Sequence, residues 1–389
     1  MALFGFMQHS AASCAMSFHL GRKNLMGIFG NAGGVNEAAV LAALKAVKDP
    51  DLQQDVVTLG FVKNLKIAAG SVSFSLELTT PACPVKDQLK AEAERAVSSL
   101  PGVQGVNVQM TFRVTTKQTQ QARTLIPEVR NTIAVASGKG GVGKSTVAAN
   151  LAVALMKFGA KVGLMDADVY GPSIPILMGA SEPPQVTQNR IIPPVTQGVK
   201  MISMGYFLPK NEAVIWRGPM LHKMIQQFLG EVEWGELDYL VIDLPPGTGD
   251  IQLSLCQTIP LTGAVIVSTP QDLALEVASK AIAMFKKLNT PILGIVENMS
   301  YYICSHCGER DEIFGHGGAR KASAQLGYPF LGEIPLNPAI RTSSDSGQPA
   351  VLMGENTLSG KAFLDIARAA AAQISIANFN APQAPVIEG

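Results

Sequence analysis

The chain has 389 residues, a length that predicts two to three domains of about 150 residues each. Hydrophobic residues make up 47% of it and charged residues 16%. A disordered chain has the opposite balance, so most of this chain is expected to fold. The 31 basic and 30 acidic residues leave a net charge of +1, which excludes the basic field that nucleic-acid binding requires.

Composition also indicates in which cellular compartment the protein is expected. No apolar run reaches the roughly 18 residues that a membrane-spanning helix needs, so we expect no membrane association. Five cysteines in a chain of this length do not indicate a disulfide framework. Two of them, Cys304 and Cys307, are separated by only two residues. This spacing predicts thiolate chemistry in a reducing compartment, and we expect a cytoplasmic protein.

Residues 1–36 are small, apolar and rich in glycine, and they show no periodicity. The first basic residues, Arg22 and Lys23, follow the apolar start instead of preceding it, so the segment is not a secretory signal. We predict a flexible extension. The alternative is that translation starts at Met26.

Residues 37–114 predict a compact α+β domain. A helical stretch covers residues 37–47, and strict alternation of apolar and polar residues over 72–78 predicts a half-buried strand. A second helical stretch and a strand over 106–114 follow. The polar residues 115–130 then predict a linker.

From residue 131 to 373, short apolar runs alternate with helical stretches. Runs that are apolar on both faces predict a parallel sheet covered by helices on both sides. Residues 273–288 place apolar side chains at helical spacing. We therefore predict a doubly wound, mostly parallel α/β domain, followed by a tail over 374–389. The predicted strands are Thr132–Ala136, Lys161–Met165, Tyr239–Ile242, Ala264–Ser268 and Ile292–Val296.

A glycine-rich loop directly after the first of these strands predicts a phosphate-binding site. Its spacing is Gly-x4-Gly-Lys-Ser in a strand–loop–helix context. The glycines let backbone N–H groups surround phosphate oxygens, and the following helix directs its positive end at the same anions. Lys144 is expected to reach the β- and γ-phosphates and Ser145 to ligate Mg²⁺. The residues assigned to ATP are Gly138, Lys139, Gly140, Gly141, Val142, Gly143, Lys144, Ser145 and Thr146.

Three aspartates end strands of the predicted sheet at the edge where ligands bind. Asp243 is the Walker B carboxylate that we expect to hold Mg²⁺, and Asp168 is placed to orient the attacking water. Asp166 is expected to support the metal, with helix capping as its alternative role. The glycine-rich residues 244–250 follow at once and predict a switch that senses the γ-phosphate.

Cys304 and Cys307 provide half of a four-thiolate site, and the chain offers no second pair. A two-fold dimer completes the set, because each subunit presents the same patch. A redox dithiol and a zinc knuckle are the alternative interpretations. Cys256 is expected in the core, and His222 on a helix surface.

Lys139, directly after the first glycine, is not required by an ordinary phosphate loop. With it, the loop resembles the deviant phosphate-loop class, which includes the MinD and ParA families. The resemblance implies that Lys139 crosses a dimer interface to the partner's nucleotide and supplies positive charge in trans. The implied catalytic residues are Lys139, Lys144 and Asp168.

Together, these segments resemble the Mrp/ApbC family of P-loop iron–sulfur cluster carriers. The small domain is similar to the iron–sulfur assembly (MIP-type) domain that is often fused to this family, through residues 49–51, 59–60 and 78–84. The segments that carry the main resemblance are Gly138–Thr146, Asp166–Pro175, Trp216–Pro219, Asp243–Asp250 and Cys304–Gly308.

The resemblance implies a homodimer in which Cys304 and Cys307 of both subunits bridge a [4Fe–4S] cluster, with ATP bound and slowly hydrolysed. It also implies that Asn298 contacts adenine, and that the partners are apo iron–sulfur proteins and cluster donors.

Cys83 is either a cluster-handling thiol or a small buried hydrophobe. The alternatives are a zinc-bridged dimeric ATPase and a MinD/ParA-like positioning ATPase. We expect a fragment that begins near Leu125 to fold, dimerise and hold a cluster.

Overall fold

The computed structural model describes residues 35–188, 190–207, 218–315 and 317–380. Residues 1–34, which make up nearly all of the expected extension and include Met26, lie outside this part, as do residues 381–389. Within the described ranges, no helix combines the length and the apolar character needed to cross a bilayer.

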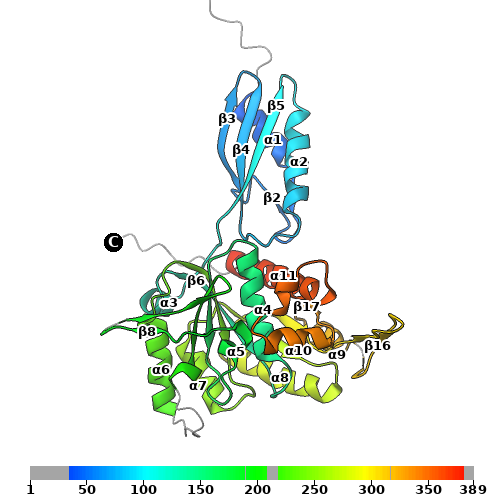
Figure 1. The fold of residues 1–389 in the computed structure, drawn as a ribbon. Coiled ribbons are helices and arrows are strands. Elements are labelled where there is room, and N and C mark those ends of the chain that lie inside the picture. Colours follow the sequence, from blue (N-terminus) through cyan, green and yellow to red (C-terminus); the bar gives the residue numbers. More distant parts are fainter. Residues whose placement is uncertain (1–34, 189, 208–217, 316, 381–389) are drawn as a thin grey trace, which may run out of the picture.

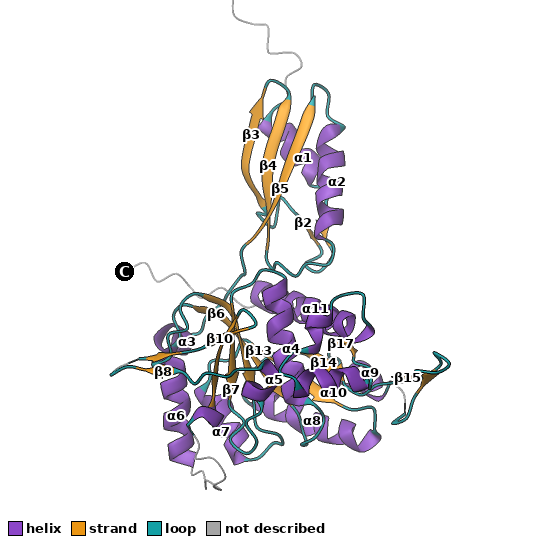
Figure 2. Ribbon diagram, in the orientation of Figure 1, coloured by secondary structure: helices purple, strands orange, loops and turns teal. Residues whose placement is uncertain are grey.

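The N-terminal unit is a small sheet with two helices packed on one face (Figure 2). In its described part three strands pair in the order β3-β4-β5, the first pair antiparallel and the second parallel. The parallel pair is joined by α2, and Leu44, Leu76 and Leu89 are buried between helices and sheet. The elements are α1 (Glu37–Leu44), β1 (Lys48–Asp49), β2 (Gln54–Asp55), β3 (Val62–Ala68), β4 (Ser71–Leu78), α2 (Lys86–Ser98) and β5 (Gly105–Phe112).

The larger unit is built on a sheet whose eight described strands run in the order β10-β11-β7-β12-β6-β13-β14-β17. The β10–β11 pair is antiparallel and the other pairs are parallel. Its strands are β6 (Val129–Ala136), β7 (Val162–Asp166), β10 (Val195–Thr196), β11 (Val199–Ser203), β12 (Leu237–Asp243), β13 (Gly263–Ser268), β14 (Ile292–Glu297) and β17 (Phe330–Glu333). The two hairpins outside it are β8 (Gln185–Val186) with β9 (Ile191–Ile192), and β15 (Tyr302–Ile303) with β16 (Arg310–Asp311).

Helices cover both faces of this sheet (Figure 1). In β12, Tyr239 and Val241 pack toward α4, α5 and α11, while Leu240 and Ile242 pack toward α6, α7 and α8. This alternation explains why the strand is apolar throughout. The helices are α3 (Gln120–Leu125), α4 (Lys144–Lys157), α5 (Ile174–Met178), η1 (Met204–Tyr206), α6 (Gly218–Gly230), α7 (Asp250–Thr258), α8 (Asp272–Lys287), α9 (Gly318–Leu326), α10 (Pro338–Asp345), η2 (Ala350–Met353) and α11 (Leu358–Asn380).

The predicted doubly wound α/β fold with a small α+β unit before it is confirmed. Two segments differ from expectation. The expected linker over 115–130 contains α3 and the first two residues of β6. The expected tail over 374–389 is helical as far as Asn380, where α11 ends. It is ordered in the helix because Ile374 and Asn378 are buried against the sheet and the connector.

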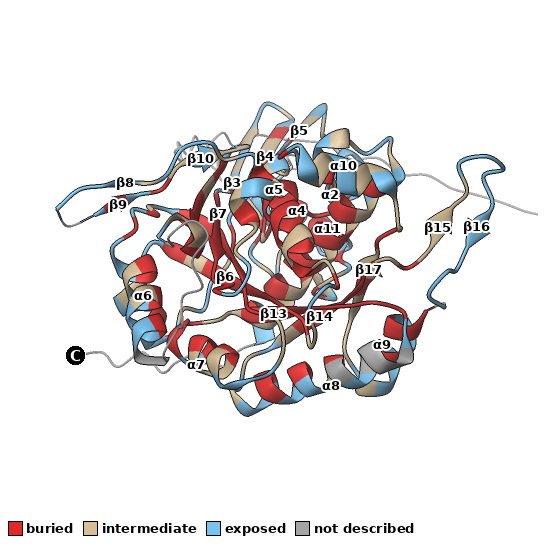
Figure 3. Cartoon of the chain, turned by 60° about the horizontal axis from the view of Figure 1, so that its bottom comes forward, coloured by how far each residue is buried: buried red, intermediate tan, exposed pale blue. Residues whose placement is uncertain are grey.

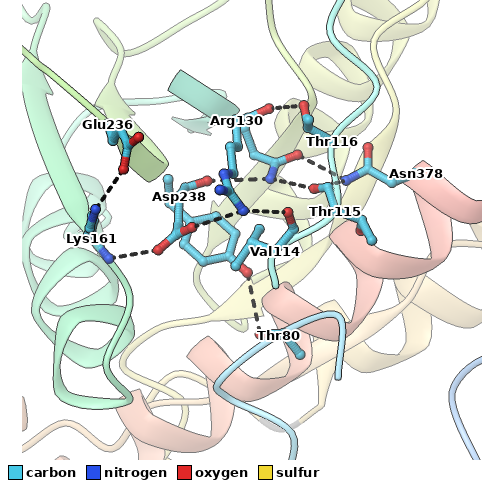
Figure 4. A network of polar contacts seen from close by, with 11 residues as sticks. Thr80, Val114, Thr115, Thr116, Arg130, Lys161, Glu236, Asp238 and Asn378 are labelled. Atoms are coloured by element: carbon cyan, nitrogen blue, oxygen red, sulfur yellow. Dashed lines mark hydrogen bonds and ion pairs between the residues drawn. The ribbon is translucent and has the colours of Figure 1, made fainter. Parts of the chain in front are cut away.

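The small unit contacts the sheet at the amino ends of the parallel strands, the edge opposite to the phosphate loop (Figure 1). The Tyr239 hydroxyl donates to Thr80 Oγ1 at 3.3 Å near the start of β12. The Asn378 amide donates to the Thr115 carbonyl at 2.8 Å, and Asn131 donates to the same oxygen at 2.9 Å (Figure 4). The connector is therefore held to the sheet and to α11 by hydrogen bonds from the buried Asn131 and Asn378 side chains.

These contacts bear on the expected fragment that begins near Leu125, whose folding stays a prediction. A fragment that begins at Leu125 loses Thr115, which leaves Asn131 and Asn378 without their shared acceptor, and it loses the buried Val114. Each amide keeps one other acceptor, the Asp238 carbonyl for Asn131 and the Asn131 side-chain oxygen for Asn378, so the loss is one hydrogen bond at each, about 0.5–1.5 kcal/mol. We expect a fragment that begins at Arg113 to unfold at a higher temperature than one that begins at Leu125. Equal melting temperatures would show that the connector adds nothing to the larger unit.

Candidate functional site

The phosphate loop joins the carboxyl end of β6 to the start of α4. Gly141 and Gly143 have φ angles of +77° and +80°, a left-handed conformation that favours glycine. A Cβ atom at Gly143 would also collide with the Asn298 amide. No side chain caps the first turn of α4, so its N–H groups stay available to an anion.

Lys144 lies at the centre of the carboxylates predicted from the sequence. Its side chain is buried, and its Nζ lies 2.5 Å from Asp243 Oδ1 and 3.5 Å from Asp168 Oδ2. The Ser145 hydroxyl is 3.3 Å from the same nitrogen. The structure therefore brings Lys144, Ser145, Asp168 and Asp243 together at the loop, and the buried ammonium offsets part of the negative charge of the two carboxylates.

The surroundings of Asp243 show whether the residues at this site fit a magnesium ion. Its side chain is fully buried, and Oδ2 has no hydrogen-bond partner in the described part of the chain. Burial raises the pKa of Asp243, while the Lys144 ammonium and the Ser145 hydroxyl oppose that rise. A carboxylate oxygen whose lone pairs accept no hydrogen bond, beside a serine hydroxyl, matches the oxygen ligands that Mg²⁺ takes next to nucleotide phosphates.

Asp166 is committed to protein contacts. Its Oδ2 accepts from the Ser203 hydroxyl at 2.8 Å and from the Ile174 N–H at 3.2 Å, and its Oδ1 accepts from the Asp168 N–H at 3.2 Å. Burial raises the pKa of Asp166 to about 7, and the Asp243 charge adds to the rise. These contacts orient the loop that carries Asp168. That Asp166 supports the metal stays a prediction. Because both of its carboxylate oxygens accept hydrogen bonds from the protein, the geometry favours support through the position of Asp168 over direct ligation.

Lys139 and Asn298 have partners within the same chain. Lys139 Nζ lies 3.2 Å from Gln271 Oε1, at the start of α8. The Asn298 amide donates to the Val142 carbonyl at 2.8 Å, so this residue holds the phosphate loop from the end of β14. A role in trans for Lys139 and an adenine contact for Asn298 stay predictions.

Cys304 and Cys307 lie in the turn between β15 and β16, on a hairpin that projects from the body of the protein (Figure 3). The turn is closed by hydrogen bonds of 2.9 Å from the Cys304 N–H to the Glu309 carbonyl and from the Gly308 N–H to the Cys304 carbonyl. Both thiols are free, and Cys307 is exposed. Among the described residues, no three His, Cys, Asp or Glu side chains are grouped to hold a metal. Within the described part of one subunit, the hairpin therefore offers two thiol ligands.

The cysteines differ in acidity. The pKa of Cys304 is lowered, first by the backbone N–H of Cys307 and then by that of His306 and the Cys307 side chain. Burial raises the pKa of Cys83 to about 11 and that of Cys256 to about 12. Cys256 is in the core, as predicted.

This contrast predicts an order of thiol reactivity, because the thiolate is the nucleophile. Among the four cysteines in the described part of the reduced, metal-free chain, we expect maleimide at neutral pH to modify Cys304 and Cys307 first. Cys83 and Cys256 should react only on unfolding. Peptide mass spectrometry after timed labelling measures the order, and modification of Cys83 as fast as Cys304 would contradict it.

Cys83 lies far from the hairpin thiols within one subunit. It belongs to the core of the small unit, one residue after Ala82, which packs against the larger unit. That contact is at the amino edge of the sheet, whereas the hairpin follows the carboxyl end of β14. A seven-residue strand such as β12 separates the two edges by about 20 Å. The buried environment supports the interpretation of Cys83 as a small hydrophobe.

His222, Trp216 and Arg217 were also singled out in the sequence. His222 is exposed, as expected, but its Nδ1 lies 2.7 Å from the Thr258 hydroxyl. Trp216 and Arg217 lie outside the described residues. Sequence reasoning missed the residues that support the hairpin, Ser300, Arg310 and Glu333, because they share no local motif and meet only in the folded chain.

Comparison with known proteins gives the same division of the chain. A family model described as a NUBPL iron-transfer P-loop NTPase matches residues 128–371. A second model, described as an iron-sulfur cluster assembly protein, matches residues 37–110.

Individual relatives cover most of the chain. It is 47% identical over 345 residues to an iron-sulfur cluster carrier protein of Synechocystis, covering 87% of this chain and 98% of the relative. It is 48% identical to the protein of the same name from Deinococcus radiodurans, covering 87% and 95%. A solved nucleotide-binding protein from Archaeoglobus fulgidus in complex with ADP has 45% identity and a TM-score of 0.53, covering 60% of this chain and 93% of that one.

Proposed function

Because the chain belongs to the family of NUBPL-type iron-transfer P-loop NTPases, we propose that it binds iron–sulfur clusters and passes them to apoproteins. The observation that carries this proposal is the pair of free thiols at the tip of a projecting hairpin in a chain with a complete phosphate loop. The names of the relatives support it, since they are iron–sulfur cluster carriers.

For the nucleotide we propose ATP with Mg²⁺. The N–H groups at the start of α4 and the Lys144 ammonium would bind the phosphates, and Ser145 with Asp243 would hold the metal. Mg²⁺ neutralises developing phosphate charge when bound. Asp168, whose N–H donates to Asp166 Oδ1, would orient a water at the γ-phosphate. The ADP complex of the Archaeoglobus relative supports nucleotide binding at this fold.

For the cluster we propose a homodimer. Two thiolates from each of two subunits give the four sulfur ligands that a [4Fe–4S] cluster takes. A cluster held by exposed turns of two chains is accessible to a recipient and is released when the subunits part. Such a site suits delivery to apo iron–sulfur proteins in a reducing compartment, and we propose the cytoplasm as its location.

The test is transfer. The full chain is reconstituted anaerobically with iron and sulfide, repurified and mixed with an apo [4Fe–4S] enzyme whose recovered activity reports delivery. We expect activation by loaded protein at a faster rate than by free iron and sulfide at equal concentration. Activation no faster than with free ions would remove the carrier proposal.

The zinc-bridged alternative uses the same thiolates, so metal analysis separates it. Loaded protein should contain iron and sulfide in equal amounts and show a brown chromophore. A colourless dimer with one zinc for two chains would support a structural zinc site. No described feature favours the positioning ATPase, because that function gives the thiol hairpin no role.

A further inference from the structure

A continuous line of contacts joins the phosphate loop to the thiol hairpin within one subunit. It begins at Asn298, whose amide donates to the Val142 carbonyl at 2.8 Å and lies against Gly143. Asn298 directly follows β14, so any movement of Val142 or Gly143 bears on the segment 297–301 that leads to the hairpin.

Glu297 is the second link. It is fully buried, and its Oε2 accepts from the Ala319 N–H at 2.7 Å, at the first turn of α9. The positive end of that helix stabilises a buried carboxylate there. Its Oε1 accepts from the Ser300 hydroxyl at 2.5 Å. Glu297 therefore fixes the position of Ser300 against a rigid element.

Glu333, Arg310 and Tyr301 form the third link. The Ser300 hydroxyl also lies 3.3 Å from Glu333 Oε2, at the end of β17. Glu333 Oε1 pairs with an Arg310 Nη at 3.2 Å, and the Arg310 guanidinium lies 3.9 Å from the centre of the Tyr301 ring. Arg310 is the first residue of β16 and Tyr301 immediately precedes β15, so this cluster holds both strands of the hairpin at its base.

The middle of the segment is strained. Met299 has φ +55°, a conformation that is uncommon for a residue with a side chain. Such strain persists only where the surroundings over-determine it, and it is concentrated at active sites, ligand clamps and switch regions. Here the surroundings are Asn298 on the phosphate loop on one side and Ser300 between two carboxylates on the other.

We propose that residues 297–301, with Glu333 and Arg310, couple the occupancy of the phosphate loop to the orientation of the Cys304–Cys307 hairpin in the same subunit. Ser300, Glu333 and Arg310 act as positioning residues for the thiols. The biological meaning of the coupling rests on the proposed carrier function, but the coupling itself does not require a cluster. It follows a different route from the switch that the sequence predicts at residues 244–250, which directly follow β12.

Thiol reactivity in the cluster-free protein tests the coupling. The reduced full-length chain is labelled with maleimide, with and without saturating Mg·ATPγS, and the rates at Cys304 and Cys307 are read by peptide mass spectrometry. We expect nucleotide to change the rate by about fivefold or more, the lower end of common couplings between sites. Arg310→Gln and Glu333→Gln should each bring the ratio of rates to within about twofold of one.

The variants should keep ATPγS affinity near that of the parent, because the partners of both side chains in the described residues lie at the base of the hairpin and not in the phosphate loop. Arg341→Gln, which breaks the exposed Arg341–Asp345 pair of 2.6 Å on α10, is the matched control and should keep the parent ratio. Melting temperatures of all variants show whether each is folded, and Ser300→Ala provides a third variant at the same link.

Two results would overturn the proposal. A parent ratio near one shows that the hairpin does not respond to nucleotide. A large ratio that survives in Arg310→Gln and Glu333→Gln shows that subunit association or the switch carries the response. Cluster loading is measured separately on the parent, so a chain that binds no cluster would remove the carrier function and leave the labelling result standing.

Discussion

Replacing Cys304 or Cys307 by serine is expected to abolish cluster binding while nucleotide binding persists. Two-fold symmetry doubles each substitution, so a single change removes two of the four proposed thiolates. A serine hydroxyl stays protonated at neutral pH and is a poor ligand for iron. Iron and sulfide content and the visible spectrum after anaerobic reconstitution measure the loss, and ATPγS titration measures the retained site.

Cys83→Ala is the matched control for this experiment. Cys83 is 7% exposed, its pKa is raised to about 11 by burial, and it lies at the opposite edge of the sheet. The variant should load as much cluster as the parent, with at most a loss of stability from the small cavity. Normal loading of the Cys304→Ser/Cys307→Ser double variant, or a loss of loading in Cys83→Ala, would contradict the ligand assignment.

The two lysines of the phosphate loop are expected to act differently. Lys144→Ala should weaken nucleotide binding itself, because the ammonium of a buried residue is removed from the phosphate site of its own subunit. Lys139→Ala should spare binding and reduce turnover, because its proposed role is in trans. Comparable cations contribute about 10³-fold or more in related phosphoryl-transfer enzymes. ATPγS affinity and steady-state hydrolysis measure the two effects.

Lys144→Ala also leaves Asp243 as an unpaired buried carboxylate, a change that destabilises proteins by about 3–5 kcal/mol. Its affinity is therefore compared at a temperature where thermal denaturation shows it folded. Lys157→Ala, exposed at the far end of α4, is the control for removing a lysine from the same helix. Equal losses of affinity in Lys139→Ala and Lys144→Ala would remove the case for a residue acting in trans.

The strands at the centre of the larger sheet were predictable from the sequence because burial on both faces makes them apolar throughout. All five expected strands correspond to β6, β7, β12, β13 and β14. The strand β3 was missed because only one of its faces is partly covered and Lys63, Asn64 and Lys66 give it a polar pattern. The helical end of α11 was missed because its burial depends on the distant Asn131 and Thr115.

For the site, too, only the residues that belong to a local sequence pattern could be placed from the sequence. Lys144, Ser145, Asp168 and Asp243 were predicted to meet because a local pattern at strand ends determines their place in a parallel sheet. The contact of Asn298 with Val142 joins residues that are 156 positions apart, and Glu333 meets Arg310 across 23 positions. Such contacts depend on how strands are ordered in the sheet, which no local spacing encodes.

In the proposed dimer, two chains hold one cluster between Cys304 and Cys307 of each. Native mass spectrometry of the anaerobically reconstituted full-length protein tests it directly. We expect a species whose mass equals two chains plus one [4Fe–4S] cluster, and cluster-free chains when both cysteines are replaced. A monomer that carries a complete cluster, or a dimer whose bridging mass is that of a single zinc ion, would contradict it.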